Sequence, residues 1–108
     1  MARLKSKPAL RDIQKYVKKM CQERGWDKDS YLVKMLLLTE ELGELAKAMR
    51  HQAKIYPEPA RRKTPRILAD EFADVLSYVC DLANYFDIDL EQAFRAKESR
   101  NRKRTWKK

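Results

Sequence analysis

The sequence predicts an all-α fold in which four helices pack as a bundle. Glycine and proline together account for six of the 108 residues, whereas lysine, glutamate, leucine and alanine, which favour helices, are abundant. Apolar residues recur every three or four positions, and no stretch alternates apolar and polar residues as a strand would. A hydrophobic content of 44% is enough for a folded chain, and 108 residues is the size of one domain. We therefore expect a single domain over residues 1–108, with flexible basic ends at 1–8 and 105–108.

The first helix is predicted to begin at Pro8 and to end before Gly25. Proline suits the first turn of a helix, and glycine readily adopts the left-handed conformation that often follows the last turn. Between them, apolar residues recur at intervals of three and four, as one helix face requires: Leu10, Ile13, Val17 and Met20.

The second helix is predicted over residues 30–52, with Asp29 or Ser30 as its N-cap. Its apolar residues are not confined to one face, because Leu37 lies off the stripe that contains Leu36 and Leu38. A helix that is apolar on several sides needs burial on several sides. In so small a chain, this predicts a contact between subunits.

Residues 53–64 are predicted to form a loop, since they contain two prolines and a basic triplet at 61–63. Thr64 and Pro65 then suit the N-cap and first position of a third helix, which we expect to continue to residue 85. The fourth helix is expected to begin after Asp89, with Gln92 completing a capping box.

The net charge of +9 is concentrated at the two ends of the chain. Residues 1–10 contain three basic side chains and no acid, and residues 95–108 contain eight basic side chains and one acid. Such ends favour solubility or contact with a polyanion. Nucleic-acid binding through the C-terminal tail is therefore a possible role, though a solvated tail is the commoner case.

Two acidic motifs lie in the middle of the chain, Glu40-Glu41-Leu42-Gly43-Glu44 and Asp70-Glu71-Phe72-Ala73-Asp74. In each, carboxylates recur at i and i+3, which places them on one helix face about 5–6 Å apart at Cβ. Two ionised carboxylates at about 5 Å repel by roughly 3 kcal/mol at an effective dielectric constant near 20. Either motif alone fits an ordinary exposed face, but the two together predict a divalent-cation site between two helices.

The available ligands favour Mg²⁺, with Mn²⁺ as a substitute. His51 is the only histidine, and no Glu-x-x-His pair is present, which argues against a di-iron bundle. A site made of carboxylate oxygens suits Mg²⁺ or Mn²⁺ better than zinc or iron.

These motifs resemble those of the MazG-like all-α nucleoside triphosphate pyrophosphohydrolases, a superfamily that includes dCTP pyrophosphatases and dimeric dUTPases. Three further stretches agree in order and spacing, so that the resemblance covers residues 10–106: Glu23-Arg24-Gly25-Trp26-Asp27, Asp87-Ile88-Asp89-Leu90 and Lys97-x-x-x-Asn101-x-x-Arg104. Thr105-Trp106 stands where the family usually has Tyr-Pro.

The resemblance implies a role for each matching residue. Four acids would ligate Mg²⁺: Glu41, Glu44, Glu71 and Asp74. Glu40 would activate water as the catalytic base. Trp26 would flank the nucleobase, and Tyr78 would approach the phosphates, although either aromatic residue could equally be a packing residue. Three C-terminal residues would bind triphosphate oxygens: Lys97, Asn101 and Arg104.

The reaction implied by the resemblance is hydrolysis of a nucleoside triphosphate to a monophosphate and pyrophosphate, by a homodimer or homotetramer that removes unwanted nucleotides. Phosphoribosyl-ATP pyrophosphohydrolase is a rival within the superfamily, and a non-catalytic helical nucleic-acid-binding module is a rival outside it.

Cys21 and Cys80 lie among apolar residues without metal-ligand spacing, and no apolar stretch of 18 residues is present. We therefore expect a cytoplasmic protein without a membrane span.

Overall fold

The computed structural model describes residues 1–56 and 68–104. This part of the chain contains no strand, which confirms the predicted all-α class. It comprises one short 3₁₀ helix, η1, and four α-helices: α1 (Leu10–Arg24), η1 (Trp26–Lys28), α2 (Tyr31–Gln52), α3 (Leu68–Tyr85) and α4 (Leu90–Arg102).

The predicted end of α1 is confirmed, but its predicted start is two residues too early. Gly25 adopts φ +74°, and its N–H donates to the carbonyl oxygens of Cys21 and Gln22. At the other end Ala9, rather than Pro8, precedes the first helical residue, and the Ala9 N–H donates to Asp12 Oδ2 at 2.9 Å. A side chain within the first turn therefore determines where α1 begins.

Side-chain caps define the starts of α2 and α4. Ser30 Oγ accepts a hydrogen bond from the Val33 N–H at 3.3 Å, and Asp89 Oδ1 accepts one from the Gln92 N–H at 3.1 Å. Both caps agree with the sequence. The predicted loop at 57–64, the start at Thr64 and Pro65, and the tail at 105–108 lie outside the described residues.

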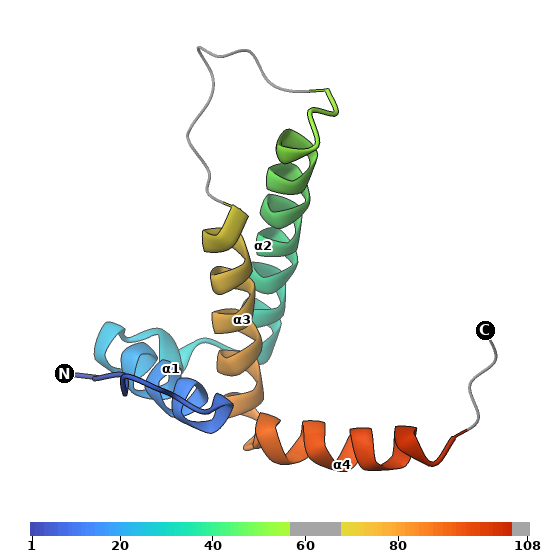
Figure 1. The fold of residues 1–108 in the computed structure, drawn as a ribbon. Coiled ribbons are helices and arrows are strands. Elements are labelled where there is room, and N and C mark those ends of the chain that lie inside the picture. The colour runs from blue at the N-terminus through green and yellow to red at the C-terminus, as the bar shows by residue number, and fades with distance from the viewer. Residues whose placement is uncertain (57–67, 105–108) are drawn as a thin grey trace.

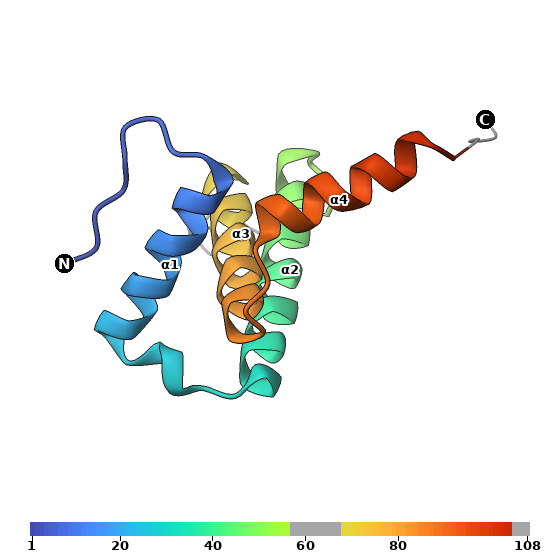
Figure 2. The ribbon, with the colours of Figure 1, turned by 90° about the horizontal axis from the view of Figure 1, so that it is seen from below.

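The helices of one chain do not close into a bundle. Helices α2 and α3 lie side by side and antiparallel, α1 crosses the lower end of α3, and α4 leads away from that end (Figures 1 and 2). The radius of gyration is 16.9 Å, whereas a compact domain of this length has one of about 13 Å. The prediction of four helices is confirmed, but their expected packing around one core is wrong for the single chain.

A small core forms where α1 meets α3. Val17, Cys21 and Cys80 are buried together, and three partly buried residues pack against them: Ile13, Met20 and Leu90.

Within the described residues, no helix has the length and apolar character needed to span a membrane.

Gln14 joins α1 to the turn between α3 and α4. Its Nε2 donates to Asn84 Oδ1 at 3.0 Å and to the Ile88 carbonyl at 2.6 Å, and its Oε1 accepts from the Leu90 N–H at 2.9 Å. Because Gln14 is only 6% exposed, these hydrogen bonds are shielded from water. They hold the start of α4 against α1.

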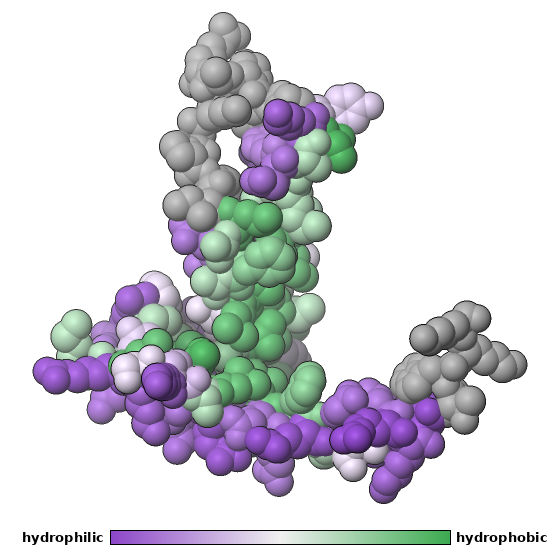
Figure 3. All heavy atoms as spheres, viewed as in Figure 1, coloured by the Kyte–Doolittle hydropathy of each residue, from purple (hydrophilic) through white to green (hydrophobic). Residues whose placement is uncertain are grey.

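Large apolar side chains remain exposed along the antiparallel pair and on α4. Leu36 is 70% exposed, Phe72 54% and Phe94 69%, and Figure 3 shows an apolar face over α2 and α3. The 3-4 spacing of the apolar residues on the third helix predicts that Phe72, Leu76 and Phe86 face inward, but all three are exposed in the single chain, where α3 packs on α2 and α1. Such a contiguous apolar face is typical of an interaction surface.

Candidate active site

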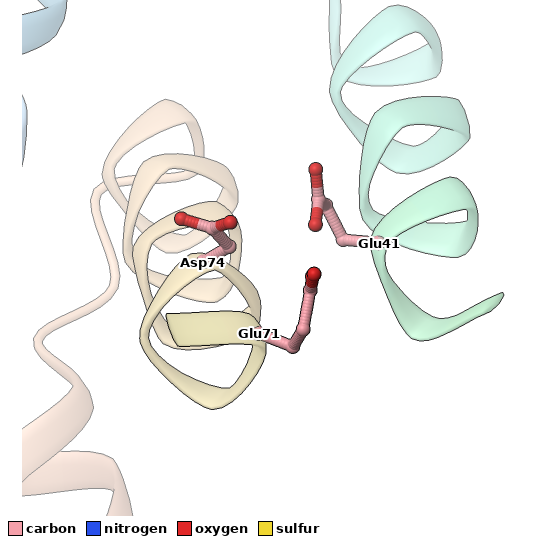
Figure 4. Close-up of side chains that lie close together, drawn as sticks. All are labelled: Glu41, Glu71 and Asp74. Atoms are coloured by element: carbon pink, nitrogen blue, oxygen red, sulfur yellow. The ribbon is translucent and has the colours of Figure 1, made fainter. Parts of the chain in front are cut away.

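Three of the predicted metal ligands meet between α2 and α3. Glu41 comes from α2, while Glu71 and Asp74 lie one turn apart on α3 and point toward it (Figure 4). One carboxylate oxygen of each lies within 4.8 Å of the other two. We call these three residues the acidic cluster.

The acidic cluster is buried at one end and open at the other. Glu71 is 8% exposed, Glu41 is half-buried and Asp74 is exposed. A buried carboxylate is costly unless a hydrogen bond or an opposite charge compensates it. Glu71 therefore forms the inner, water-shielded end of the cluster. Asp74 forms the outer end, which a ligand can reach from solvent.

Two other acids predicted for the site lie outside this group of three. Glu44 is half-buried one turn after Glu41 on α2, and Glu40 is exposed beside it. The charge of Glu40 does reach the site, because it is among the charges that raise the pKa of Tyr78.

The acidic cluster fits a hard divalent cation. Mg²⁺ binds oxygens at 2.0–2.1 Å in octahedral geometry, so opposite ligands lie about 4 Å apart. The three carboxylate oxygens, which lie within 4.8 Å of one another, are close to that spacing. Three carboxylates without nitrogen or sulfur ligands suit Mg²⁺ or Mn²⁺.

A cavity of about 290 Å³ opens from the acidic cluster toward α1, and we call it the side cavity. Glu41 and Asp74 line one end, and Ser77 and Tyr78 continue along α3. The remaining walls come from α1, η1 and the next turn of α3: Val17, Met20, Cys21, Arg24, Trp26 and Asp81.

The two predicted aromatic site residues both line the side cavity. Burial, together with the charges of Glu41 and Asp74, raises the pKa of Tyr78, so its phenol stays protonated and can donate a hydrogen bond. Trp26 is 47% exposed, and the Arg24 guanidinium lies 5.1 Å from the centre of its ring. Both side chains are thus available to a ligand in the cavity.

The three predicted C-terminal site residues are not brought to the acidic cluster. Lys97 and Asn101 lie on α4 and Arg104 follows it, and α4 packs on α1 and leads away from the α2–α3 pair (Figures 1 and 2). A larger hollow of about 700 Å³ lies along α1 and α4, but none of the predicted site residues lines it.

Sequence reasoning missed a buried ion pair next to the site. Lys34 is 3% exposed, and its Nζ lies 3.0 and 2.9 Å from the two carboxylate oxygens of Asp81 and 3.0 Å from the Trp26 carbonyl oxygen. The sequence contained a signal for this pair. Lys34 lies two turns before Glu41 on α2, and Asp81 lies two turns after Asp74 on α3, so both share the helix faces that carry the acidic cluster.

Cys21 lies against this ion pair. Burial, reinforced by the charge of Asp81 and a hydrogen bond with it, raises the pKa of the Cys21 thiol to about 11. The thiol is therefore protonated at neutral pH, which makes it a poor nucleophile and metal ligand. The structure supports the interpretation of Cys21 as a core residue.

The fold and the cluster together define an all-α protein with a group of carboxylates between two antiparallel helices. The sequence profile of the MazG nucleotide pyrophosphohydrolase domain matches residues 30–106. The chain belongs to this family, as its motifs indicated.

The chain is similar to several known proteins. It is 38% identical over 93 residues to YpjD of Bacillus subtilis, covering 82% of this chain and 78% of YpjD. A crystal structure of YpjD superposes with a TM-score of 0.75 at 34% identity, covering 94% of this chain and all of that one. Mouse dCTP pyrophosphatase 1 is 33% identical over 105 residues, but this chain spans only 62% of its length.

Proposed function

We propose that the protein is a Mg²⁺-dependent nucleoside triphosphate pyrophosphohydrolase, which converts a (deoxy)nucleoside triphosphate and water to the monophosphate and pyrophosphate. The observation that carries this proposal is the acidic cluster opening onto the side cavity. Family membership and the similarity to dCTP pyrophosphatase 1 support the same reaction class.

Glu41, Glu71 and Asp74 would hold the cation, and Glu44 would join them by a change of side-chain rotamer. When bound, Mg²⁺ would neutralise charge on the phosphate oxygens and lower the pKa of a water molecule. Mn²⁺ would substitute, because it accepts the same oxygen ligands. The cation is needed because carboxylates alone repel a triphosphate.

The chain's own residues would then position the substrate and move the proton. Glu40, next to the cluster in sequence and exposed, would accept a proton from the attacking water. Tyr78 would donate its phenolic hydrogen to a phosphate oxygen. The Trp26 ring, at the other side of the cavity, would stack on the nucleobase.

Assembly into a homodimer or homotetramer would bury the apolar face and supply the phosphate-binding residues. The exposure of Leu36 and the extended shape of the chain support assembly. In such an assembly, α4 of a neighbouring copy would bring Lys97, Asn101 and Arg104 to the triphosphate. Light scattering should give a mass of two or four chains, and the mass of one chain, 12.9 kDa, would contradict the proposal.

A screen for pyrophosphate release tests the reaction. Canonical and modified nucleoside triphosphates, with phosphoribosyl-ATP included, are incubated with the protein in Mg²⁺ or in EDTA. We expect release in Mg²⁺ only, and its loss in a Glu41→Gln/Glu71→Gln double variant. If release from every substrate is absent, or persists in the double variant, the proposed enzyme or its ligand assignment fails.

Nucleic-acid binding is the second candidate, and one observation favours it. Basic side chains, including Arg95, Arg100 and Arg102, are exposed along α4, which stands apart from α2 and α3. Retarded migration of DNA at low salt, without any pyrophosphate release, would favour this module over the enzyme.

As an enzyme, the protein would act in the cytoplasm, where it would remove non-standard or surplus nucleotides.

A further inference from the structure

The side cavity extends from the acidic cluster to the carboxylate of Asp81. Asp81 lies seven residues after Asp74 on α3, which corresponds to about 10 Å along the helix axis. Ser77 and Tyr78 line the wall between them. A nucleotide with its phosphates at the cluster would therefore direct its sugar and base toward Asp81.

Asp81 is held in place by the ion pair with Lys34. Its side chain is 13% exposed and that of Lys34 is 3% exposed. The lysine ammonium has three hydrogens, and three acceptors surround it: both oxygens of Asp81 and the Trp26 carbonyl oxygen, all at 2.9–3.0 Å. Lys34 is thus occupied as a donor. A carboxylate offers about four acceptor positions, and Lys34 and the Cys21 thiol use three of those on Asp81, which leaves one for a ligand.

The surroundings of Asp81 in the side cavity suit a flat aromatic ring. Val17, Met20 and Cys21 supply apolar walls from α1, and Trp26 supplies an indole ring. The Lys34 amine also fixes the backbone of Trp26, so the indole and the carboxylate are positioned by one side chain. Arg24, Ser77 and Tyr78 also line the cavity. Next to Asp81, the protonated Cys21 thiol is a weak donor, and the Asp81 carboxylate is the strong acceptor.

We propose that Asp81 is a specificity-determining residue that accepts a hydrogen bond from the exocyclic amino group of the nucleobase. The inference rests on the proposed function and names its substrate class, nucleotides of cytosine or adenine in preference to those of uracil or hypoxanthine. A carboxylate accepts from the amino group of such a base. A keto oxygen at the same place would meet an acceptor with no hydrogen to share, leaving both groups unsatisfied.

Matched substrates test the proposal on the wild-type protein. The triphosphates dCTP and dUTP differ at this position in an amino or a keto group, and dATP and dITP form the corresponding purine pair. We expect kcat/KM for the amino member to exceed that for the keto member at least tenfold in each pair that is hydrolysed. Equal values in a protein that releases pyrophosphate would overturn the inference and leave the proposed function intact.

Two variants locate the preference at Asp81. Asp81→Asn supplies an amide that can donate to a keto group, so we expect the dCTP/dUTP ratio to fall at least tenfold. Lys34→Met/Asp81→Leu removes both charges together and avoids a lone buried lysine, so this chain should fold and lose the preference. The matched control is Asp87→Asn, which changes an exposed acid outside the side cavity and should keep the wild-type ratio. An unchanged ratio in both Asp81 variants would refute the assignment.

Binding of the monophosphates separates this inference from the proposed reaction. Calorimetric titration with dCMP and dUMP, and with dAMP and dIMP, needs no turnover. If no triphosphate is hydrolysed, the proposed function fails, while at least tenfold tighter binding of an amino-bearing monophosphate still supports the role of Asp81. Equal affinities, or no binding of any of the four, would overturn it.

Discussion

Two groups of charged side chains lie between α2 and α3, two helical turns apart, and they differ in the balance of their charges. At the inner group, Lys34 and Asp81 match opposite charges within 3.0 Å. At the acidic cluster, Glu41, Glu71 and Asp74 converge with like charges. Both groups use the same face of each helix, because Lys34 and Glu41, like Asp74 and Asp81, are seven residues apart.

The difference indicates different roles for the two groups. An ion pair that carries its own counter-charge can be satisfied within the folded chain. A convergence of like charges is stabilised by an external cation, and a cation held there can also bind phosphates. We therefore interpret the cluster as the reacting end of the site and the ion pair as the part that holds its far end in place.

The largest effect is expected from neutralising the buried member of the acidic cluster. Glu71→Gln keeps the shape of the side chain and removes its charge, so we expect pyrophosphate release to fall at least about 10³-fold, equivalent to about 4 kcal/mol of transition-state stabilisation. Its neighbour Asp70 is exposed and outside the cluster. Asp70→Asn is therefore the control, and the comparison between the two groups would lose its basis if both variants kept full activity.

Breaking the ion pair should instead affect stability. Lys34→Met leaves Asp81 without its counter-charge and should lower the free energy of unfolding by about 3–5 kcal/mol, whereas Lys34→Met/Asp81→Leu should be nearly neutral. Urea denaturation monitored by circular dichroism measures both. Equal destabilisation by the single and the double change would show that charge matching is not what the pair contributes.

Divalent cations should stabilise the folded protein through the acidic cluster alone. At a Mg²⁺ concentration ten times the dissociation constant, linkage predicts about 1.4 kcal/mol of added stability and a higher melting temperature. The Glu41→Gln/Glu71→Gln variant should show no such increase. The same increase in both proteins would place cation binding elsewhere.

The smallest expected effect is the pH dependence due to Cys21. Burial raises the pKa of this thiol from the ordinary value of 9.0 to about 11, so the folded state holds the proton more tightly than the unfolded state. The stabilisation is therefore complete below pH 9 and is lost as the pH rises toward 11. Urea midpoints for wild type and Cys21→Ala should converge over this interval, and parallel curves would contradict the burial of the thiol against Asp81.

The ends of the helices could be predicted from the sequence because their signals are local. Ser30 and Asp89 cap helices through residues three positions away, and Gly25 ends α1 through its own backbone conformation. The convergence of Glu41 with Glu71 and Asp74 followed from helical spacing combined with the family resemblance.

The rest depends on contacts between distant parts of the chain. Lys34 and Asp81 are 47 residues apart, and their pairing requires the register of α2 against α3. The direction of α4 is set by the hydrogen bonds of Gln14 at the turn, which no local pattern encodes. For the same reason the sequence identified Phe72 as apolar without showing that α2 leaves it exposed.

The most direct test of the account is a crystal of the protein soaked in Mn²⁺, because the anomalous signal of manganese locates the ion. We predict a peak between α2 and α3, coordinated by carboxylate oxygens of Glu41, Glu71 and Asp74. A soaked crystal in which these side chains bind no manganese would contradict the claim that the acidic cluster is a cation site.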